Sequence, residues 1–114
     1  MSPITTHVLD TARGCPAAGL TVVLERSDGS GGWIELARGT TNRDGRIGDL
    51  LPDQPPLATG IYRLRFATGD YFSSLEARGF YPEVHVMVQV DDSSRHYHIP
   101  LLLSPFGYST YRGS

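Results

Sequence analysis

Three of the four histidines stand where they could carry chemistry. His96 and His98 lie two positions apart, and His7 lies near the start of the chain. Two histidines at positions i and i+2, joined by a third from another strand, could hold a metal ion. The residues beside His96 and His98 include no acid and no cysteine, so a metal site is the less favoured interpretation. A single histidine on a strand is more often an ordinary surface residue.

The end of the chain is the second place where chemistry could lie. Tyr111-Arg112-Gly113-Ser114 closes the sequence, shortly after the histidine-bearing segment. Chain ends commonly fray because nothing holds them. Tyrosine and arginine each combine packing area with specific hydrogen bonds, which is unusual for a frayed end. Two interpretations stay open: a surface tail with chance aromatics, or a segment that packs against the histidines.

Signatures of the common enzyme classes are missing from the sequence. There is no G-x-S-x-G elbow, no phosphate-binding loop and no Cys–His pair. Arg46 directly follows the turn Asn42-Arg43-Asp44-Gly45, where an exposed arginine is unremarkable. Residue chemistry alone therefore does not name a reaction.

Size and charge exclude several kinds of partner. The chain has 114 residues, which is the size of one domain, and we expect residues 1–114 to form a single domain. Charged residues make up 19%, below the roughly 25% usual for soluble proteins, which leaves room for buried contact between subunits. The formal net charge is -2 and no basic block occurs, so we expect neither nucleic acid nor membrane as a partner.

The cysteine content and the N-terminus bear on the compartment. No stretch approaches the roughly 20 apolar residues that span a bilayer, and the N-terminus lacks the basic start and apolar run of a secretory signal. The lone Cys15, between Gly14 and Pro16, is expected to be a small loop residue without a disulfide partner. This usage fits a reducing compartment, so we expect a cytoplasmic protein.

Alternation of apolar and polar residues predicts the elements that position these side chains. Period-two patterns mark strands with one buried face at residues 20–25, 62–66 and 84–90. Further strands are expected near residues 4–10, 33–41, 46–50, 95–103 and 107–112. Residues 70–78 alone predict a helix, capped by Asp70 or Ser73 and ended by Gly79. About eight short strands with one short helix indicate an all-β fold, an antiparallel β-sandwich.

The same alternation assigns a face to each histidine. In the segment 95–103 the apolar set points into the sandwich, namely Tyr97, Ile99, Leu101 and Leu103. The outer face then receives His96, His98, Pro100 and Leu102. In the N-terminal strand Val8 faces inward, while His7 and Leu9 face outward. Imidazoles mixed with proline and leucine make a poor solvated surface, so this face is expected to contact another subunit or a ligand.

Four motifs together resemble a known family, the 5-hydroxyisourate hydrolases. These enzymes are relatives of the hormone carrier transthyretin. The resemblance runs from Ile4 to Ser114, and the C-terminal tetrapeptide is its most specific mark because the carriers lack it. It rests on Thr6-His7-Val8-Leu9-Asp10-Thr11, Asn42-Arg43-Asp44-Gly45-Arg46, His96-Tyr97-His98-Ile99-Pro100-Leu101-Leu102-Leu103-Ser104-Pro105 and Tyr111-Arg112-Gly113-Ser114.

The resemblance implies a fold and an assembly. The fold is a transthyretin-like sandwich of two four-stranded sheets, and the assembly is a homotetramer in which two dimers meet through outer sheet faces. Active sites lie in the central channel at that contact. No cofactor and no metal are implied. The carriers use the same channel for hormone.

The resemblance also implies a reaction and site residues. The family opens a ring of 5-hydroxyisourate to give 2-oxo-4-hydroxy-4-carboxy-5-ureidoimidazoline in urate degradation, a step of purine metabolism. His7 and His98 are candidates to activate water and move protons, and either could be the base, because imidazole titrates near neutral pH. Arg46 is a candidate to hold the substrate and to stabilise the developing oxyanion.

The tail and His96 receive their roles from the same resemblance. Tyr111 and Arg112 are expected to line the pocket and bind substrate. Ser114, with its terminal carboxylate, is expected to orient a histidine or the water. His96 shares the outer face and is expected to be only a wall residue.

Two other functions remain possible at this point. A transthyretin-like carrier would bind aromatic ligands in its channel, although bulky residues at the C-terminus should close that channel into a shallow pocket. A structural tetramer would use the histidines to bind metal. Both share the predicted fold with the hydrolase, so only tests of chemistry separate the three.

Overall fold

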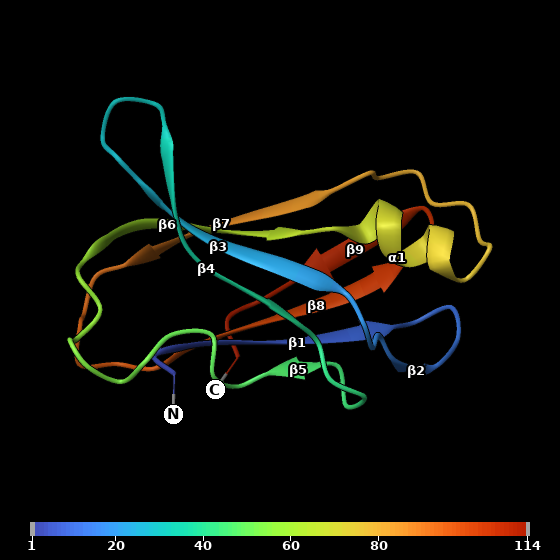
Figure 1. Ribbon diagram of the computed structural model, residues 1–114, viewed down its shortest axis with the longest axis horizontal. Coiled ribbons are helices and arrows are strands. Elements are labelled where there is room, and N and C mark those ends of the chain that lie inside the picture. The colour runs from blue at the N-terminus through green and yellow to red at the C-terminus, as the bar shows by residue number, and fades with distance from the viewer. Residues whose placement is uncertain (1, 114) are drawn as a thin grey trace.

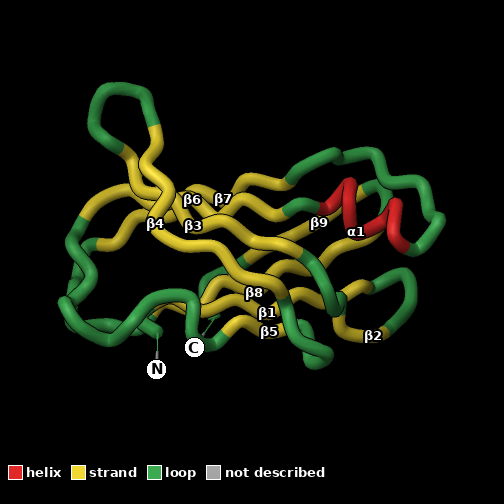
Figure 2. The backbone as a smooth tube through the Cα atoms, in the orientation of Figure 1, coloured by secondary structure: helices red, strands yellow, loops and turns green. Residues whose placement is uncertain are grey.

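Two β-sheets packed face to face form the body of the chain in the computed structural model, which describes residues 2–113 (Figure 1). Strands are the main regular structure, and the one helix of the described residues lies at one end of the sandwich (Figure 2). The first sheet has the order β2-β1-β8-β9, with β5 also paired to β1, and the second has the order β4-β3-β6-β7. The first sheet comprises β1 (Ile4–Asp10), β2 (Cys15–Pro16), β5 (Arg46–Ile47), β8 (Tyr97–Ser104) and β9 (Gly107–Thr110). The second comprises β3 (Thr21–Ser27), β4 (Trp33–Thr40), β6 (Gly60–Phe66) and β7 (Val84–Val90), and the helix is α1 (Thr68–Ser74).

The all-β sandwich with one short helix is confirmed, but two details of its sheets are corrected. The first sheet has five strands rather than four, because β2 and β5 each add two residues alongside β1. Cys15, expected in a loop, pairs with Asp10 in this way. The pairing is also not antiparallel throughout, since β1 and β8 run parallel. Parallel neighbours need a long connection, and most of the chain separates these two strands.

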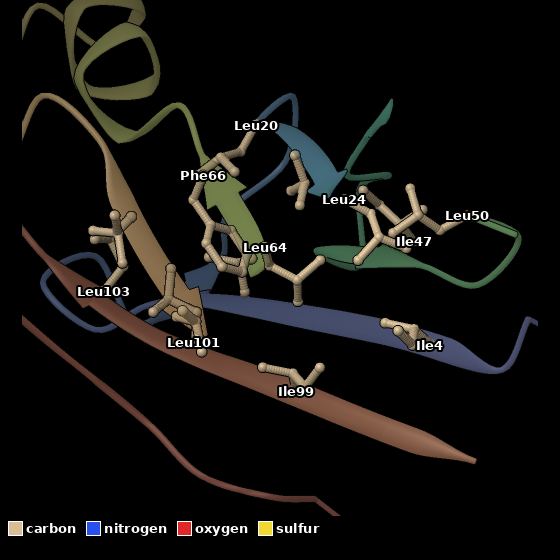
Figure 3. Packing of buried hydrophobic residues seen from close by; sticks show 14 of the residues in the cluster. Ile4, Leu20, Leu24, Ile47, Leu50, Leu64, Phe66, Ile99, Leu101 and Leu103 are labelled. Carbon is tan, nitrogen blue, oxygen red and sulfur yellow. The ribbon is translucent and has the colours of Figure 1, made fainter. Parts of the chain in front are cut away.

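The core confirms the inward set read from alternation. Side chains from both sheets meet between them, including Ile4 of β1, Leu64 of β6 and Leu101 of β8 (Figure 3). Val8 is fully buried, whereas His7 on the same strand is half-buried. The sheet therefore presents one apolar face to the core and one mixed face outward.

The helix differs from its prediction at both ends. It begins at Thr68, two residues before the expected residue 70. It ends at Ser74, four residues before the expected residue 78. The predicted caps are wrong: Ala67 occupies the N-cap position and provides no side-chain hydrogen bond. Thr68 instead donates its hydroxyl to the carbonyl of Tyr81, so tertiary contact fixes the start of the helix.

Candidate active site

Strands β1, β5 and β8 bring three of the predicted site residues onto one sheet face. His7 of β1 pairs with Arg46 of β5 on one side and with Pro100 of β8 on the other. Thr5 of β1 pairs with His98 of β8. Cross-strand partners point to the same face of a sheet. We call this outer surface of β1, β5 and β8 the histidine face.

Thr5 links two histidines of this face. Its Oγ1 lies 2.7 Å from Nδ1 of His98 and 3.1 Å from Nε2 of His96, both within hydrogen-bond distance. The two imidazoles are stacked, with ring centres 6.5 Å apart and planes inclined by 16°. Sequence reasoning missed Thr5, because a threonine gives no chemical signal of its own; the available clue was that it lies two residues before His7 on the same strand. His96, which was expected to be only a wall residue, is hydrogen-bonded to the same Thr5 hydroxyl as His98.

A hollow of about 300 Å³ opens over these side chains. Arg46, which follows the turn as expected, is exposed and lines it. Its walls also include Thr5, His96 and His98. This space accepts a small ligand, and every polar side chain named here is a hydrogen-bond donor or titratable base rather than an acid.

The surroundings hold both site histidines in the neutral form. Partial burial lowers the pKa of His7 below 6.5, and the nearby Arg46 guanidinium lowers it further, against a smaller opposing effect of the Asp44 backbone. Burial also lowers the pKa of His98, followed by the positive charges of Arg46, His96 and His7. A neutral imidazole has a free nitrogen lone pair, so both residues can accept a proton at neutral pH.

The C-terminal tail is attached to β8 through Gly113. The backbone N–H of Gly113 donates to the carbonyl of His98 at 2.8 Å. A side chain at this position would place its Cβ 2.6 Å from Cδ2 of the His98 ring, which is too close for real atoms. The frayed-tail interpretation is therefore wrong for Gly113, and only glycine allows this contact with the imidazole.

Pro100 interrupts the pairing between β8 and the C-terminal tail. The β8–β9 pairing ends at Leu101 and Thr110, and an isolated bridge in the same register joins His98 to Gly113. Pro100 lies in that gap and has no N–H to offer. Although expected on an outer face, Pro100 is already buried within one chain, because β8 runs between β1 and β9.

The structure does not bring Tyr111 and Arg112 into the hollow that contains Arg46. Both line a second hollow, of about 340 Å³, which His98 also borders. The Arg112 guanidinium carbon lies 4.7 Å from the centre of the Tyr97 ring, in cation–π contact. Tyr111 is 58% exposed. Ser114 lies outside the described residues.

The described residues show neither a metal-binding cluster nor a membrane-spanning helix. Within residues 2–113 no three His, Cys, Asp or Glu side chains are grouped closely enough to hold a metal ion. Over the same residues, no helix is both long and apolar enough to cross a membrane.

Comparison with known proteins decides the family. The family described as HIUase/Transthyretin matches residues 4–113. The chain belongs to this family. A 5-hydroxyisourate hydrolase of Salmonella dublin is 47% identical over 111 residues, covering 97% of this chain and 80% of the relative. The resemblance drawn from the four motifs is thereby confirmed.

Solved structures of both branches of the family share the fold. The structure of a Klebsiella pneumoniae 5-hydroxyisourate hydrolase is 36% identical, with a TM-score of 0.84, and covers 97% of this chain and 98% of its own. Sea bream transthyretin in complex with thyroxine is 31% identical, with a TM-score of 0.91, and covers 98% and 95%. Fold alone therefore does not separate enzyme from carrier.

Proposed function

We propose that this chain is a hydrolase that opens the ring of 5-hydroxyisourate to 2-oxo-4-hydroxy-4-carboxy-5-ureidoimidazoline in urate degradation. The observation that carries the proposal is the meeting of His7, Arg46 and His98 on one sheet face. Burial and the Arg46 charge lower the pKa of both histidines there, which favours their neutral form. The curated relatives named 5-hydroxyisourate hydrolase support the same reaction.

The chemistry requires a base, an oxyanion donor and a proton for the leaving nitrogen. A neutral His7 or His98 takes a proton as water attacks the ring carbonyl carbon. Arg46 offers guanidinium donors to the oxygen on which negative charge develops. The C–N bond of the cyclic amide then breaks, and the ring nitrogen receives a proton as it leaves.

The tail completes the pocket in this proposal. Tyr111 and Arg112 bind the substrate from the side opposite Arg46, across His98. The terminal carboxylate of Ser114 orients a histidine or the attacking water. No metal or cofactor takes part in any of these steps.

The proposed assembly is a homotetramer in which the histidine faces of two dimers meet. Leu9 and Leu102 are half-buried side chains beside this face and would lie in the contact. Leu102→Asp would place a charge in a desolvated interface and should dissociate the tetramer into dimers, with loss of activity. Light scattering of the native protein decides the premise, and a monomer at micromolar concentration contradicts it. A cytoplasmic location stays a prediction.

The direct test generates 5-hydroxyisourate with urate oxidase and follows its ultraviolet decay. Dialysed, chelator-treated protein should speed this decay, which is spontaneous without enzyme. Unchanged decay would contradict the hydrolase. Binding of aromatic ligands without hydrolysis would favour the carrier, which the likeness to sea bream transthyretin keeps as the second candidate. Stoichiometric metal in untagged protein would favour the structural tetramer.

A further inference from the structure

Thr5 is placed between two imidazoles in a way that couples them. Its side chain is nearly buried, at 8% exposure, and its Oγ1 is within reach of His98 and His96 at once. A hydroxyl carries one proton. It can therefore donate to only one of the two rings and must accept from the other, so the two histidines cannot choose their tautomers independently.

The direction of these bonds follows from the use of His98 as a base. Nδ1 of His98 faces Thr5, so its free nitrogen is Nε2. For Nε2 to accept a proton, the ring proton of the neutral imidazole must sit on Nδ1 and be donated to Thr5 Oγ1. The Thr5 hydroxyl is then free to donate to Nε2 of His96. The arrangement thus holds His98 in the tautomer that a base requires.

We propose that Thr5 and His96 form a proton relay that fixes the resting tautomer of His98 and holds its displaced proton during ring opening. This inference rests on the proposed function. In the relay, Nε2 of His98 accepts a proton while its Nδ1 proton passes to Thr5 Oγ1. The Thr5 hydroxyl proton passes at the same time to Nε2 of His96. When Nε2 then gives its proton to the leaving nitrogen, both transfers run backward and restore the Nδ1–H form of His98. Protons therefore balance over the cycle, and nothing is oxidised or reduced.

The reaction itself provides a proton that must leave. Of the two protons of the attacking water, one goes to the leaving nitrogen, and the other ends on the new carboxylic acid. That acid is ionised at neutral pH, because carboxyl groups titrate near about pH 4. Each turnover therefore also releases one proton, which the exposed His96 can accept directly at the wall of the same hollow.

His96 is placed as the outlet of such a relay. It is exposed, and it lines both the hollow that contains Arg46 and a neighbouring hollow of about 350 Å³. The charged side chains around that second hollow are Asp53 and Arg95. A proton on the exposed imidazole can pass directly to water or buffer, whereas the partly buried His98 has less access.

The first test compares three threonine variants by steady-state kinetics. Thr5→Val keeps the shape and removes the hydroxyl, so kcat should fall by about tenfold or more, less than the roughly 10²–10⁴ expected for a catalytic base, with KM little changed. Thr5→Ser should restore most of the rate. The matched control is Thr6→Val, because Thr6 lines the same hollow but its hydroxyl donates to the Ile99 carbonyl, not to an imidazole. Equal kcat in the Thr5 and Thr6 valine variants would overturn the relay.

The second test uses His96→Ala and added imidazole. Loss of the outlet should slow turnover, and free imidazole in the buffer should restore the rate by accepting the proton. Thr6→Val should show no such rescue. A His96→Ala variant with an unchanged rate, or one that imidazole does not rescue, would overturn the outlet role of His96.

A third measurement does not depend on activity. Nitrogen NMR of ¹⁵N-labelled protein should find the His98 ring proton on Nδ1, and Thr5→Val should lose this preference. A dominant Nε2–H form in the native protein would overturn the inference. If the native protein fails to hydrolyse 5-hydroxyisourate, the proposed function fails, while the NMR result still decides whether Thr5 sets the tautomer.

Discussion

The two outer sheet faces carry similar residue types with opposite partners. On the face formed by β3, β6 and β7, basic groups meet acids. Arg63 donates to Glu25 at 2.8 Å, while Arg65 and His85 contact Glu83 at 3.1 and 3.0 Å. We call this set the charged face. On the histidine face, by contrast, no carboxylate of residues 2–113 forms an ion pair with Arg46, His7 or His98.

The two faces differ in whether their basic groups are paired with acids. Hydrogen bonds from His85 and Arg65 lower the pKa of Glu83, so acid and base stabilise each other there. On the histidine face burial and then the Arg46 guanidinium lower the pKa of both histidines, and the smaller opposing effect of Asp44 acts on His7. Within residues 2–113 Arg46 has no ion-pair partner, so its donors are open to a ligand. The basic groups of the charged face are instead paired with Glu25 and Glu83.

The largest expected effect distinguishes the histidines of the histidine face from His85 of the charged face. His98→Ala should lower kcat by roughly 10²–10⁴, the usual contribution of a positioned acid or base, and His7→Ala should act in the same way. Their double variant should cost little more than the worse single one, because both serve one proton pathway. The control His85→Ala, on the charged face, should keep its activity. Near-normal kcat/KM in a folded His98→Ala protein would remove that residue from the mechanism.

The next contrast concerns two arginines. Arg46→Glu reverses the charge offered to the oxyanion and should lower kcat by at least about 10²-fold, with little change in melting temperature. Arg63→Glu places a second acid against the nearly buried Glu25, so it should lower the melting temperature and leave activity of the folded protein intact. Assays paired with calorimetry decide, and the comparison of faces fails if both variants lose the same property.

A smaller effect is expected at two glycines near the end of the chain. Gly113→Ala would force its Cβ against the His98 ring and should lower kcat by about tenfold through misplacement of the imidazole. Gly107→Ala in β9 is the matched control, since its nearest neighbour would lie at 3.7 Å. Equal kinetics of the two variants would show that Gly113 does not position His98.

The sequence alone predicted which side chains lie on the histidine face. It did not predict the contacts that join them. Alternation is a local property, so it placed His7 outward and Val8 inward correctly. The hydrogen bonds of Thr5 depend on which residue of β8 lies opposite, and that register is set by parallel pairing across most of the chain. The close approach of Gly113 likewise depends on tertiary structure. Family resemblance supplied Arg46, which its turn position alone did not mark.

The smallest predicted effect is a difference in pH dependence between the two faces. His7 and His98 bind a proton less readily in the folded than in the unfolded chain, so stability should fall as pH drops below 6.5 towards their lower folded pKa values. Glu83 has its pKa lowered from 4.5, so its contribution is present above pH 4.5 and is lost as pH falls further. Glu83 is largely exposed, which keeps its step small because water screens its partners.

Melting temperatures measured from about pH 7.5 to about pH 3, a range that spans the ordinary pKa values of histidine and glutamate, should therefore separate the faces. The His7→Ala/His98→Ala double variant should flatten the upper part of the curve and leave the lower part unchanged. Glu83→Gln should do the reverse, because it removes only the acidic group of the charged face. If the double histidine variant keeps the native slope below pH 6.5, the two imidazoles are not held neutral by burial and Arg46. The charge difference between the faces would then have no thermodynamic consequence.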